Sequence, residues 1–429
     1  MKISNATKAA IAALVFSSLL AGCKGGDTAP TDTSSNGGGK TATTTGDTTK
    51  KERPVSPAPG NKAGDTIIVG LVASQNGDQK PWGDDNVKGA QLALDDFNHD
   101  NPQGIQGKKI DLRIGDSGSK PEQGKSAAEK LIADGALALD GEVASGITMQ
   151  MGEAAFEKGV PVVAVGATRT DLMDKGTNMF RVCYADDFQG AVMANFAYKD
   201  LGLHKVAIIT DKKLPYSTGL SDNFRATFVK LGGEIVDEEF YEGGQKDFKG
   251  QLTNAKAKNP EGMYCSGYFT EVGPLLKQAH DLGINTPFLG GDGWDSPTII
   301  TAIGNEIVSS PDFKAYFSNH YNDHDSRPQV KTFLDHWAKK YNGSKPGTTM
   351  GALGYDAMSL TLDAIKRAKT LDSKSIIEAL ENTEKFAAVS GDITLKGMNG
   401  TPLKRALVDQ VTKDGFTVRK DYAPDQVTR

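Results

Sequence analysis

Short apolar segments of two kinds alternate along the 429-residue chain from residue 66 to about residue 315. Runs rich in β-branched residues, such as Thr66–Val72, are typical of strands that are buried on both faces of a parallel sheet. The segments between them repeat apolar residues at helical spacing, and in Val87–Asn98 four apolar residues fall on one helical face. Strands that alternate with helices predict α/β units built on mostly parallel sheets.

The same pattern gives residue ranges for the elements. The predicted strands are Thr66–Val72, Ile110–Ile114, Leu137–Leu139, Val160–Val165, Lys205–Thr210, Glu234–Tyr241, Met263–Ser266 and Pro287–Leu289. The predicted helices among them are Val87–Asn98, Pro121–Asp134, Gln189–Leu201, Gly219–Leu231, Phe248–Lys258 and Gly273–Leu282.

Beyond Ala315 helices dominate, and the chain closes with strands. The predicted elements there are the helices Gln329–Tyr341, Gly351–Arg367 and Ser373–Asn382, the strand Gly391–Leu395, and the paired strands Arg405–Thr412 and Gly415–Lys420. The turn Lys413-Asp414-Gly415 suits a short β connection between the last two strands.

The amino terminus has the pattern of an export signal. Lys2 and Lys8 precede an apolar run of about a dozen residues, which is too short to span a bilayer. The run ends in Leu20-Ala21-Gly22-Cys23, which resembles the lipobox of bacterial lipoprotein signal peptides. The resemblance implies cleavage before Cys23 and a lipid on its thiol, so residues 1–22 are expected to be removed. An ordinary signal peptide with an incidental cysteine is the alternative.

Residues 23–64 contain mainly Gly, Ser, Thr, Asp, Lys and Pro. A segment with so few apolar residues cannot bury enough surface to offset the entropy of ordering, so it predicts a disordered linker. The pattern of lipid, linker and folded region indicates a protein held at a membrane and working outside the cytoplasm, in a periplasm or on the outer face of the only membrane.

Composition limits the remaining possibilities. About 365 residues follow the linker, which suits two lobes better than one core. Loss of residues 1–22 would delete two lysines and no acidic residue, which changes the formal net charge from −5 to −7. A mildly acidic protein is a poor candidate for nucleic-acid binding. Cys183 and Cys265 could form a disulfide or remain as two buried thiols, and the sequence leaves both open.

Catalytic and metal motifs are weak in this sequence. It has no His-Glu-x-x-His, paired Cys-x-x-Cys or Walker A pattern, so neither a metal nor a cofactor is expected. The metal-binding residue types at His320, Asp323, His324 and Asp325 are better explained by a solvated loop. Ser145 lacks the Gly-x-Ser-x-Gly elbow that exposes a nucleophilic serine, which argues against an exported hydrolase.

Polar and aromatic residues instead gather after the predicted strands, where open α/β sheets bind ligands. They are Gly141–Ser145, Gly166–Thr168, Tyr216, Tyr268, Asp292 and Trp82, the last in the loop after the first strand.

Six segments in order carry a resemblance that covers nearly all of the chain after residue 66. They are IIVGLVASQNGDQKPWGDDNVKGAQLALDDFN, GIQGKKIDLRIGDSGSKPEQGKSAAEKLI, GVPVVAVGATRTDL, FRVCYADDFQG, YCSGYFTEVGPLLKQAHDLG and FLGGDGW. The chain resembles type I periplasmic solute-binding proteins of the branched-chain amino acid ABC-transporter group. The resemblance implies two doubly wound α/β lobes, residues 66–183 plus 319–390 and residues 184–318 plus 391–429. Three crossovers would join them, near Arg181–Ala185, Tyr316–His320 and Val389–Ile393.

The resemblance also implies roles for site residues. Ser145 and Thr168, with backbone N–H groups of Gly166–Thr168 (Ala167 included), would hold the α-carboxylate of an amino acid, and Asp292 would hold its α-ammonium group. The closing residues and pocket walls would be Tyr216, Tyr268, Trp82 and Met350.

Each of these residues also has a purely structural interpretation. Ser145, Thr168 and Asp292 could cap helices or turns, and the tyrosines could pack within a lobe.

The sequence departs from the family pattern at Gly146-Ile147-Thr148-Met149, where relatives often carry a Ser/Thr-rich run. The size and side-chain class of the ligand therefore stay open, since the family also binds amides, urea and aromatic acids. The leading hypothesis is a monomeric binding protein that delivers an amino acid to the permease subunits of an ABC importer. The alternative is a sensory receptor of the same fold that binds another ligand.

Overall fold

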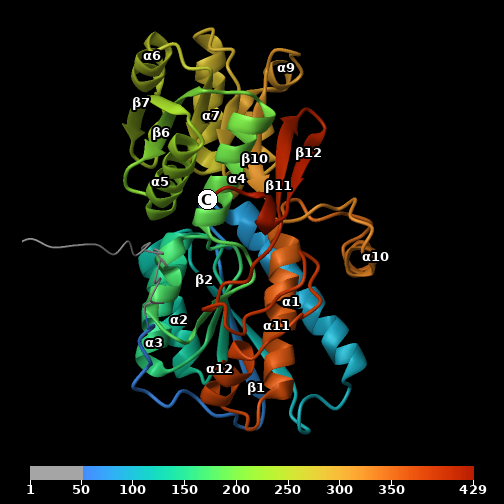
Figure 1. The fold of residues 1–429 in the computed structure, drawn as a ribbon. Coiled ribbons are helices and arrows are strands. Elements are labelled where there is room, and N and C mark those ends of the chain that lie inside the picture. The colour runs from blue at the N-terminus through green and yellow to red at the C-terminus, as the bar shows by residue number, and fades with distance from the viewer. Residues whose placement is uncertain (1–51) are drawn as a thin grey trace, which may run out of the picture. The chain divides into compact units, whose positions relative to one another are not determined.

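Two separate β-sheets organise residues 52–429, the part of the chain that the computed structural model describes. One sheet has five strands in the order β2-β1-β3-β4-β5, and the other has seven in the order β12-β11-β10-β9-β8-β6-β7. We call the parts of the chain built on them the five-stranded half and the seven-stranded half (Figure 1). The expected signal peptide, Cys23 and most of the expected linker lie outside the described residues.

The five-stranded sheet is parallel throughout. Its strands are β1 (Ile67–Ala73), β2 (Ile110–Asp116), β3 (Ala138–Gly141), β4 (Val162–Ala164) and β5 (Met179–Arg181). The helices around it are α1 (Lys80–Asp100), α2 (Pro121–Ala133), α3 (Ser145–Lys158), α10 (Pro328–Lys340), α11 (Met350–Arg367) and α12 (Ser373–Glu381). In β1, Val69 and Leu71 pack in the same apolar cluster as Ala90 of α1, while Val72 packs with Leu131 of α2. Helices thus bury both faces of this strand, as its continuous apolar run predicts.

The seven-stranded sheet is parallel from β7 to β10 and ends in an antiparallel pair. Its strands are β6 (Lys205–Asp211), β7 (Glu234–Tyr241), β8 (Gly262–Cys265), β9 (Phe288–Gly290), β10 (Ala315–Asn319), β11 (Ala406–Thr412) and β12 (Gly415–Tyr422). Its α-helices are α4 (Asp186–Asn195), α5 (Pro215–Lys230), α6 (Lys249–Ala257), α7 (Phe269–Asp281), α8 (Thr298–Ile303) and α9 (Asn305–Val308). The predicted terminal hairpin is confirmed, with Thr412 paired to Gly415.

The chain passes between the halves three times. It leaves β5 for α4, leaves β10 for α10, and returns from α12 to β11, so α10–α12 belong with the five-stranded half. Figure 1 shows α11, α12 and β1 in the lower part of the view and α5–α7 in the upper part. The predicted α/β class with two parallel-sheet lobes is confirmed. The exact lobe bounds inferred from the resemblance stay a prediction.

Some predicted elements were wrong. Trp82 lies in the first turn of α1 rather than in a loop, because Pro81 begins the helix earlier than the apolar periodicity indicates. Gly391–Leu395 is not a strand; only Ile393 pairs there, in an isolated bridge with Phe386. Strands β5 and β10 were not predicted as strands, because each is a short buried segment close to a connection between the halves.

The predicted linker was too long at its C-terminal end. Residues 53–63, which we call the strap, are hydrogen-bonded along the five-stranded half. Arg53 donates to the carbonyls of Gly176 and Met179, at 3.2 and 2.8 Å. The side chain of Asn61 donates to two further carbonyls, each at 2.9 Å. Specific polar contacts hold this segment, although its composition offers little apolar surface.

Both described cysteines are free and fully buried, so the structure has two thiols where the sequence left a disulfide open. Burial raises the pKa of Cys183 to about 12, and it also raises the pKa of Cys265. Within residues 52–429, no helix combines the length and apolar character that a membrane crossing requires.

The strap predicts a stability effect at Arg53, whose side chain is 6% exposed. Replacing Arg53 by Ala removes two hydrogen bonds to buried carbonyls and should lower the free energy of unfolding by about 2 kcal/mol, measured by urea denaturation. Val55→Ala is the matched control, since Val55 is 76% exposed and should change stability by less than about 0.5 kcal/mol. Equal stability of the two variants would contradict a docked strap.

The buried thiols predict slow chemistry in the folded state. In the chain from residue 24 onward, Cys183 and Cys265 are the only cysteines. Without reductant, a thiol reagent should label neither in buffer and both in guanidinium chloride, because burial disfavours the reactive thiolate. Absence of labelling in denaturant would instead reveal a disulfide.

Candidate functional site

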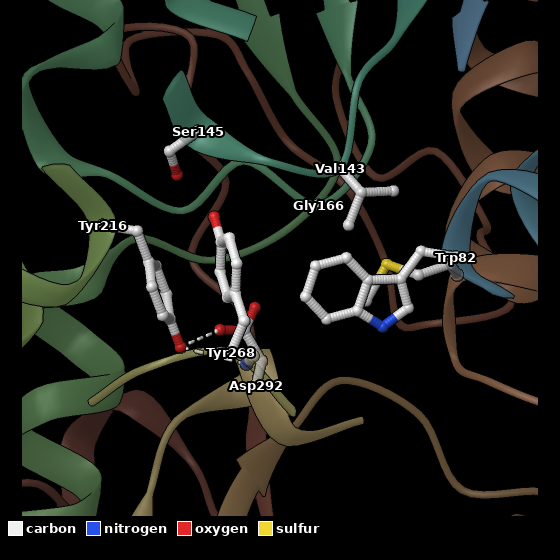
Figure 2. Close-up of a pocket in the computed structure, with 9 residues that line it drawn as sticks. Trp82, Val143, Ser145, Gly166, Tyr216, Tyr268 and Asp292 are labelled. Atoms are coloured by element: carbon white, nitrogen blue, oxygen red, sulfur yellow. Dashed lines mark hydrogen bonds between the residues drawn. The ribbon is translucent and has the colours of Figure 1, made fainter. Parts of the chain in front are cut away.

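A small cavity lies where residues of both halves meet. The residues that line it are Trp82, Val143, Ser145, Gly166, Tyr216, Tyr268, Asp292, Gly293 and Met350 (Figure 2). The structure thus brings seven of the nine predicted ligand residues to one place. Ala167 and Thr168 are buried nearby but do not line the cavity.

Strand ends position most of these side chains. Ser145 begins α3 after β3, Tyr268 precedes α7 after β8, and Asp292 begins a 3-10 turn, η3 (Asp292–Trp294), after β9. Tyr216 stands in the first turn of α5, after β6. Because the carboxyl ends of parallel strands meet at one edge of a sheet, residues far apart in sequence converge there.

Asp292 is the central charged group of the cavity. Only 4% of the residue is exposed, and its carboxylate accepts three hydrogen bonds. Tyr216 Oη and Gln189 Nε2 donate to Oδ1 at 2.9 and 3.0 Å, and His320 Nε2 lies 2.8 Å from Oδ2. Among the described residues, no Lys or Arg forms an ion pair with Asp292. The Asp292 carboxylate is therefore stabilised by hydrogen bonds from polar side chains, without a Lys or Arg partner in residues 52–429.

A second buried carboxylate, Asp186, lies close to Asp292. Gln189 Nε2 donates to Asp186 Oδ1 at 2.6 Å and so contacts both acids. Burial raises the pKa of Asp186 to about 7, and the charge of Asp292 raises it as well. The region therefore carries excess negative potential on the side of the seven-stranded half.

Aromatic rings form a further part of the cavity wall. Trp82 meets Tyr268 edge to face at 5.0 Å and Phe269 at 4.9 Å, while Tyr268 stacks on Tyr216. Trp82 Nε1 donates to the carbonyl of Asp295 at 2.6 Å. Trp82 comes from the five-stranded half and its partners from the other, so these contacts join the two halves.

Two further contacts join the halves beside the cavity. The N–H and hydroxyl of Thr349 each donate to Asp295 Oδ2 at 2.6 Å. Arg169 Nη1 donates to the carbonyl of Pro215 at 2.7 Å. Burial raises the pKa of Asp295 to about 7. The structure is therefore a closed arrangement, with polar contacts made across the division between the halves.

The start of α3 reaches the cavity wall through Ser145, and Val143 of the preceding loop also lines it. The N-cap residue Ala144 has no side chain that could cap the helix, so the structural reading of Ser145 as a cap is wrong. Glu142 accepts hydrogen bonds from Ser74, Ser117 and the N–H groups of Val143 and Ala144, which fixes this loop. Burial raises the pKa of Glu142.

In the segment Gly166–Thr168, Gly166 lines the cavity, whereas Ala167 and Thr168 accept hydrogen bonds from neighbouring segments. A Cβ on Gly166 would lie 2.9 Å from both Met350 Sδ and Val143 Cγ1, so only glycine allows this close packing. The Thr168 carbonyl accepts the N–H of Asp186 at 2.8 Å, and the Ala167 carbonyl accepts from Arg181. Direct ligand contacts by Ala167 and Thr168 stay a prediction.

The sequence analysis missed Gly293, Gln189 and His320 as site residues, and it included Val143 only within the range Gly141–Ser145. The expectation that His320 lies in a solvated loop was wrong, because its side chain is fully buried. His320 directly follows β10, so the rule that polar residues after strands form the site would have found it had that strand been predicted. Asp323 and His324 lie apart from this site, and Asp323 pairs with Lys345. Within residues 52–429, no group of three or more His, Cys, Asp or Glu could hold a metal ion.

Comparison with known proteins gives consistent matches. The family model described as periplasmic binding protein matches residues 66–415. A Leu/Ile/Val-binding protein of Rhizobium johnstonii is 33% identical over 332 residues, which cover 76% of this chain and 87% of that protein.

Solved structures agree. The leucine-binding protein LivK of Thermotoga maritima has a TM-score of 0.78 and 32% identity, and the match covers 84% of this chain and 100% of that one. LivJ of Streptococcus pneumoniae, solved with isoleucine, has a TM-score of 0.75 and 29% identity over 83% of this chain and 98% of that one. A solute-binding protein of R. palustris, solved with 4-hydroxybenzoate, has a TM-score of 0.74 and 20% identity. The match covers 84% of this chain and 97% of that one, and it shows a shared fold alone.

The family match spans most of the chain, and the R. johnstonii relative exceeds 30% identity over most of its own length. The resemblance seen in the sequence is thereby confirmed. The chain belongs to the periplasmic binding protein family and, within it, to the group of the Leu/Ile/Val-binding proteins.

Proposed function

We propose that this protein is the extracytoplasmic substrate-binding component of an ABC importer and that it captures a branched-chain amino acid between its two halves. The observation that carries the proposal is the environment of Asp292. A buried carboxylate with three neutral donors and no Lys or Arg partner in residues 52–429 keeps its charge uncompensated. An α-ammonium group would supply the missing positive charge through charge-assisted hydrogen bonds.

The opposite wall suits the α-carboxylate. Ser145 and the uncapped first turn of α3 offer a hydroxyl and N–H groups at the positive end of a helix of 14 residues. Burial raises the pKa of Tyr268, and a hydrogen bond from the Ser145 N–H to the Tyr268 hydroxyl partly opposes that rise. A zwitterion would therefore meet donors on the five-stranded half and an acceptor on the seven-stranded half, and favour the closed arrangement.

Trp82, Val143 and Met350 make the remaining wall apolar, which favours an aliphatic ligand side chain. Relatives named as Leu/Ile/Val-binding proteins and the isoleucine complex of LivJ support this ligand class. The alternative of an aromatic acid is less favourable, because such a ligand lacks an ammonium group and would leave Asp292 without a cation. A sensory receptor with the same amino-acid ligand would use the same site.

The amino terminus supports the place of action. A lipid on Cys23 would hold the protein at the membrane that carries its permease, and would raise its effective concentration there. As a monomer without a cofactor, the protein would present the closed, loaded form to the permease subunits.

Asp292→Asn tests the ligand site. The amide keeps the size of the side chain but removes its charge, so leucine affinity in the chain from residue 24 onward should fall by about 100-fold or more, measured by titration calorimetry. Asp222→Asn is the matched control, because Asp222 lies on the surface of α5 and is 71% exposed. Leucine binding by Asp292→Asn within about threefold of the parent would contradict the role of Asp292. No binding of any of the twenty amino acids by the parent would overturn the proposed function.

Cys23→Ser tests the anchor in the full-length protein. Without the thiol no lipid can be attached, so the protein should move from the membrane fraction to the soluble fraction and lose incorporation of labelled palmitate. Cys183→Ser controls for loss of a cysteine that is buried in the fold. A full-length protein that carries no label, and that fractionates like Cys23→Ser, would rule out lipidation.

A further inference from the structure

His320 stands where connections between the halves meet, behind the cavity. It directly follows β10, at the point where the chain leaves the seven-stranded half for α10. Its ring stacks on Tyr184, with centroids 3.9 Å apart and an interplanar angle of 25°. Tyr184 belongs to the first connection, between β5 and α4. Lys404, in the third connection, donates to the carbonyl of Val182 at 2.8 Å and so ties the third connection to the first.

The hydrogen bonds of the ring define its tautomer. His320 Nε2 lies 2.8 Å from Asp292 Oδ2, and an ionised carboxylate only accepts, so Nε2 carries the hydrogen. Nδ1 is buried and has no hydrogen-bond partner in the described part of the chain. A charged ring would bury a second N–H without an acceptor, which is unfavourable. Burial accordingly lowers the pKa of His320, although Asp292 opposes that shift.

A neutral donor has a specific effect on Asp292. Tyr216 and Gln189 both donate to Oδ1, whereas His320 is the donor seen at Oδ2 among residues 52–429. The ring therefore fixes the rotation of the carboxylate group without adding a positive charge beside it. The full negative charge stays available to a cationic group that enters from the cavity.

We propose that His320 is a positioning residue for ligand binding: as a neutral Nε2–H donor it orients Asp292 toward the ligand's ammonium group and connects that carboxylate to the segments joining the halves. The inference rests on the proposed function, because it assigns His320 a part in the same site. It makes the affinity depend on a residue that does not itself line the cavity.

The titratable and charged groups around the ring bear on its protonation. Asp292 and Lys404 act on the ring directly, Tyr184 stacks on it with Cys183 nearby, and Asp186 lies beside Asp292. The cavity that His320 lines on its other side also has the titratable residues Tyr321, His324, Asp325, Arg327, Arg405 and Asp421. Asp186 matters most for the design of a test, since its pKa of about 7 makes it titrate in the same range. A comparison of two variants that both retain Asp186 removes this contribution.

The first measurement is leucine affinity at pH 7.5 by titration calorimetry, on the chain from residue 24 onward. His320→Leu removes the donor and should weaken binding at least tenfold. In His320→Gln the amide Nε2 can stand close to the position of the ring Nε2 and donate to Asp292, so affinity should stay within about threefold. His280→Leu is the matched control, because His280 lies on α7 and its side chain is 42% exposed.

The second measurement separates this role from a merely structural one. Because burial lowers the pKa of His320, the parent ring gains a proton only at pH values below about 6.5, the ordinary pKa of histidine, and its charge then competes with the ligand's ammonium group. The parent should therefore lose affinity between pH 7 and pH 5, while His320→Gln, which cannot titrate, should lose less. The ratio of the two dissociation constants should change at least threefold over this range.

The outcomes are distinct. A parent that binds no amino acid overturns the proposed function. A parent that binds leucine through Asp292, with His320→Leu equal to it or with a constant ratio between the parent and His320→Gln, overturns only the role of His320. If circular dichroism shows that His320→Leu does not fold, the test rests on the ratio of the dissociation constants of the parent and His320→Gln. A ratio that changes with pH supports the role of His320, and a constant ratio overturns it.

Discussion

Asp292 places an ionic charge in the interior of the protein without a cationic side chain beside it, and the surrounding elements are arranged to make that possible. Burial of a carboxylate costs free energy that only well-placed donors offset. The donors come from α5, from α4 and from the residue after β10. Gln189 also accepts from Ser318 of β10 at 2.7 Å, so the same network fixes the helix against the strand. Hydrogen bonds of Asp292 and Gln189 therefore couple the positions of α4, α5 and β10.

The division between the halves combines polar contacts with aromatic ones, and both kinds meet at Asp295. Contacts at Asp295 and Arg169 hold the halves together without a ligand group in between, but none of them neutralises Asp292. The ring of Trp82 closes the apolar side through Tyr268 and Phe269. Closure through these contacts leaves the charge of Asp292 without a cation, which would give the proposed zwitterion an advantage over other ligands of similar size.

The sequence predicted most of this arrangement, and its failures have physical reasons. Apolar runs identified the buried strands, and polar residues at strand ends identified Ser145, Tyr216, Tyr268 and Asp292, because sheet geometry brings such positions together. His320 was missed because β10 is a short segment between a loop and a connection. Gln189 lies within a helix, where local pattern does not reveal which neighbour its amide will contact. Such contacts depend on how two distant segments pack, and periodicity carries no information on that.

The strap would have a mechanical consequence in a protein held by a lipid on Cys23, as proposed above. Residues 53–63 make their hydrogen bonds along the five-stranded half, at carbonyls of residues such as Gly176, Phe156 and Ile132. Any force that reaches the chain at residue 52 is therefore carried by that half alone. In the proposed anchored protein the seven-stranded half would bear no load, so the anchor would add no cost to a movement of that half through the three connections.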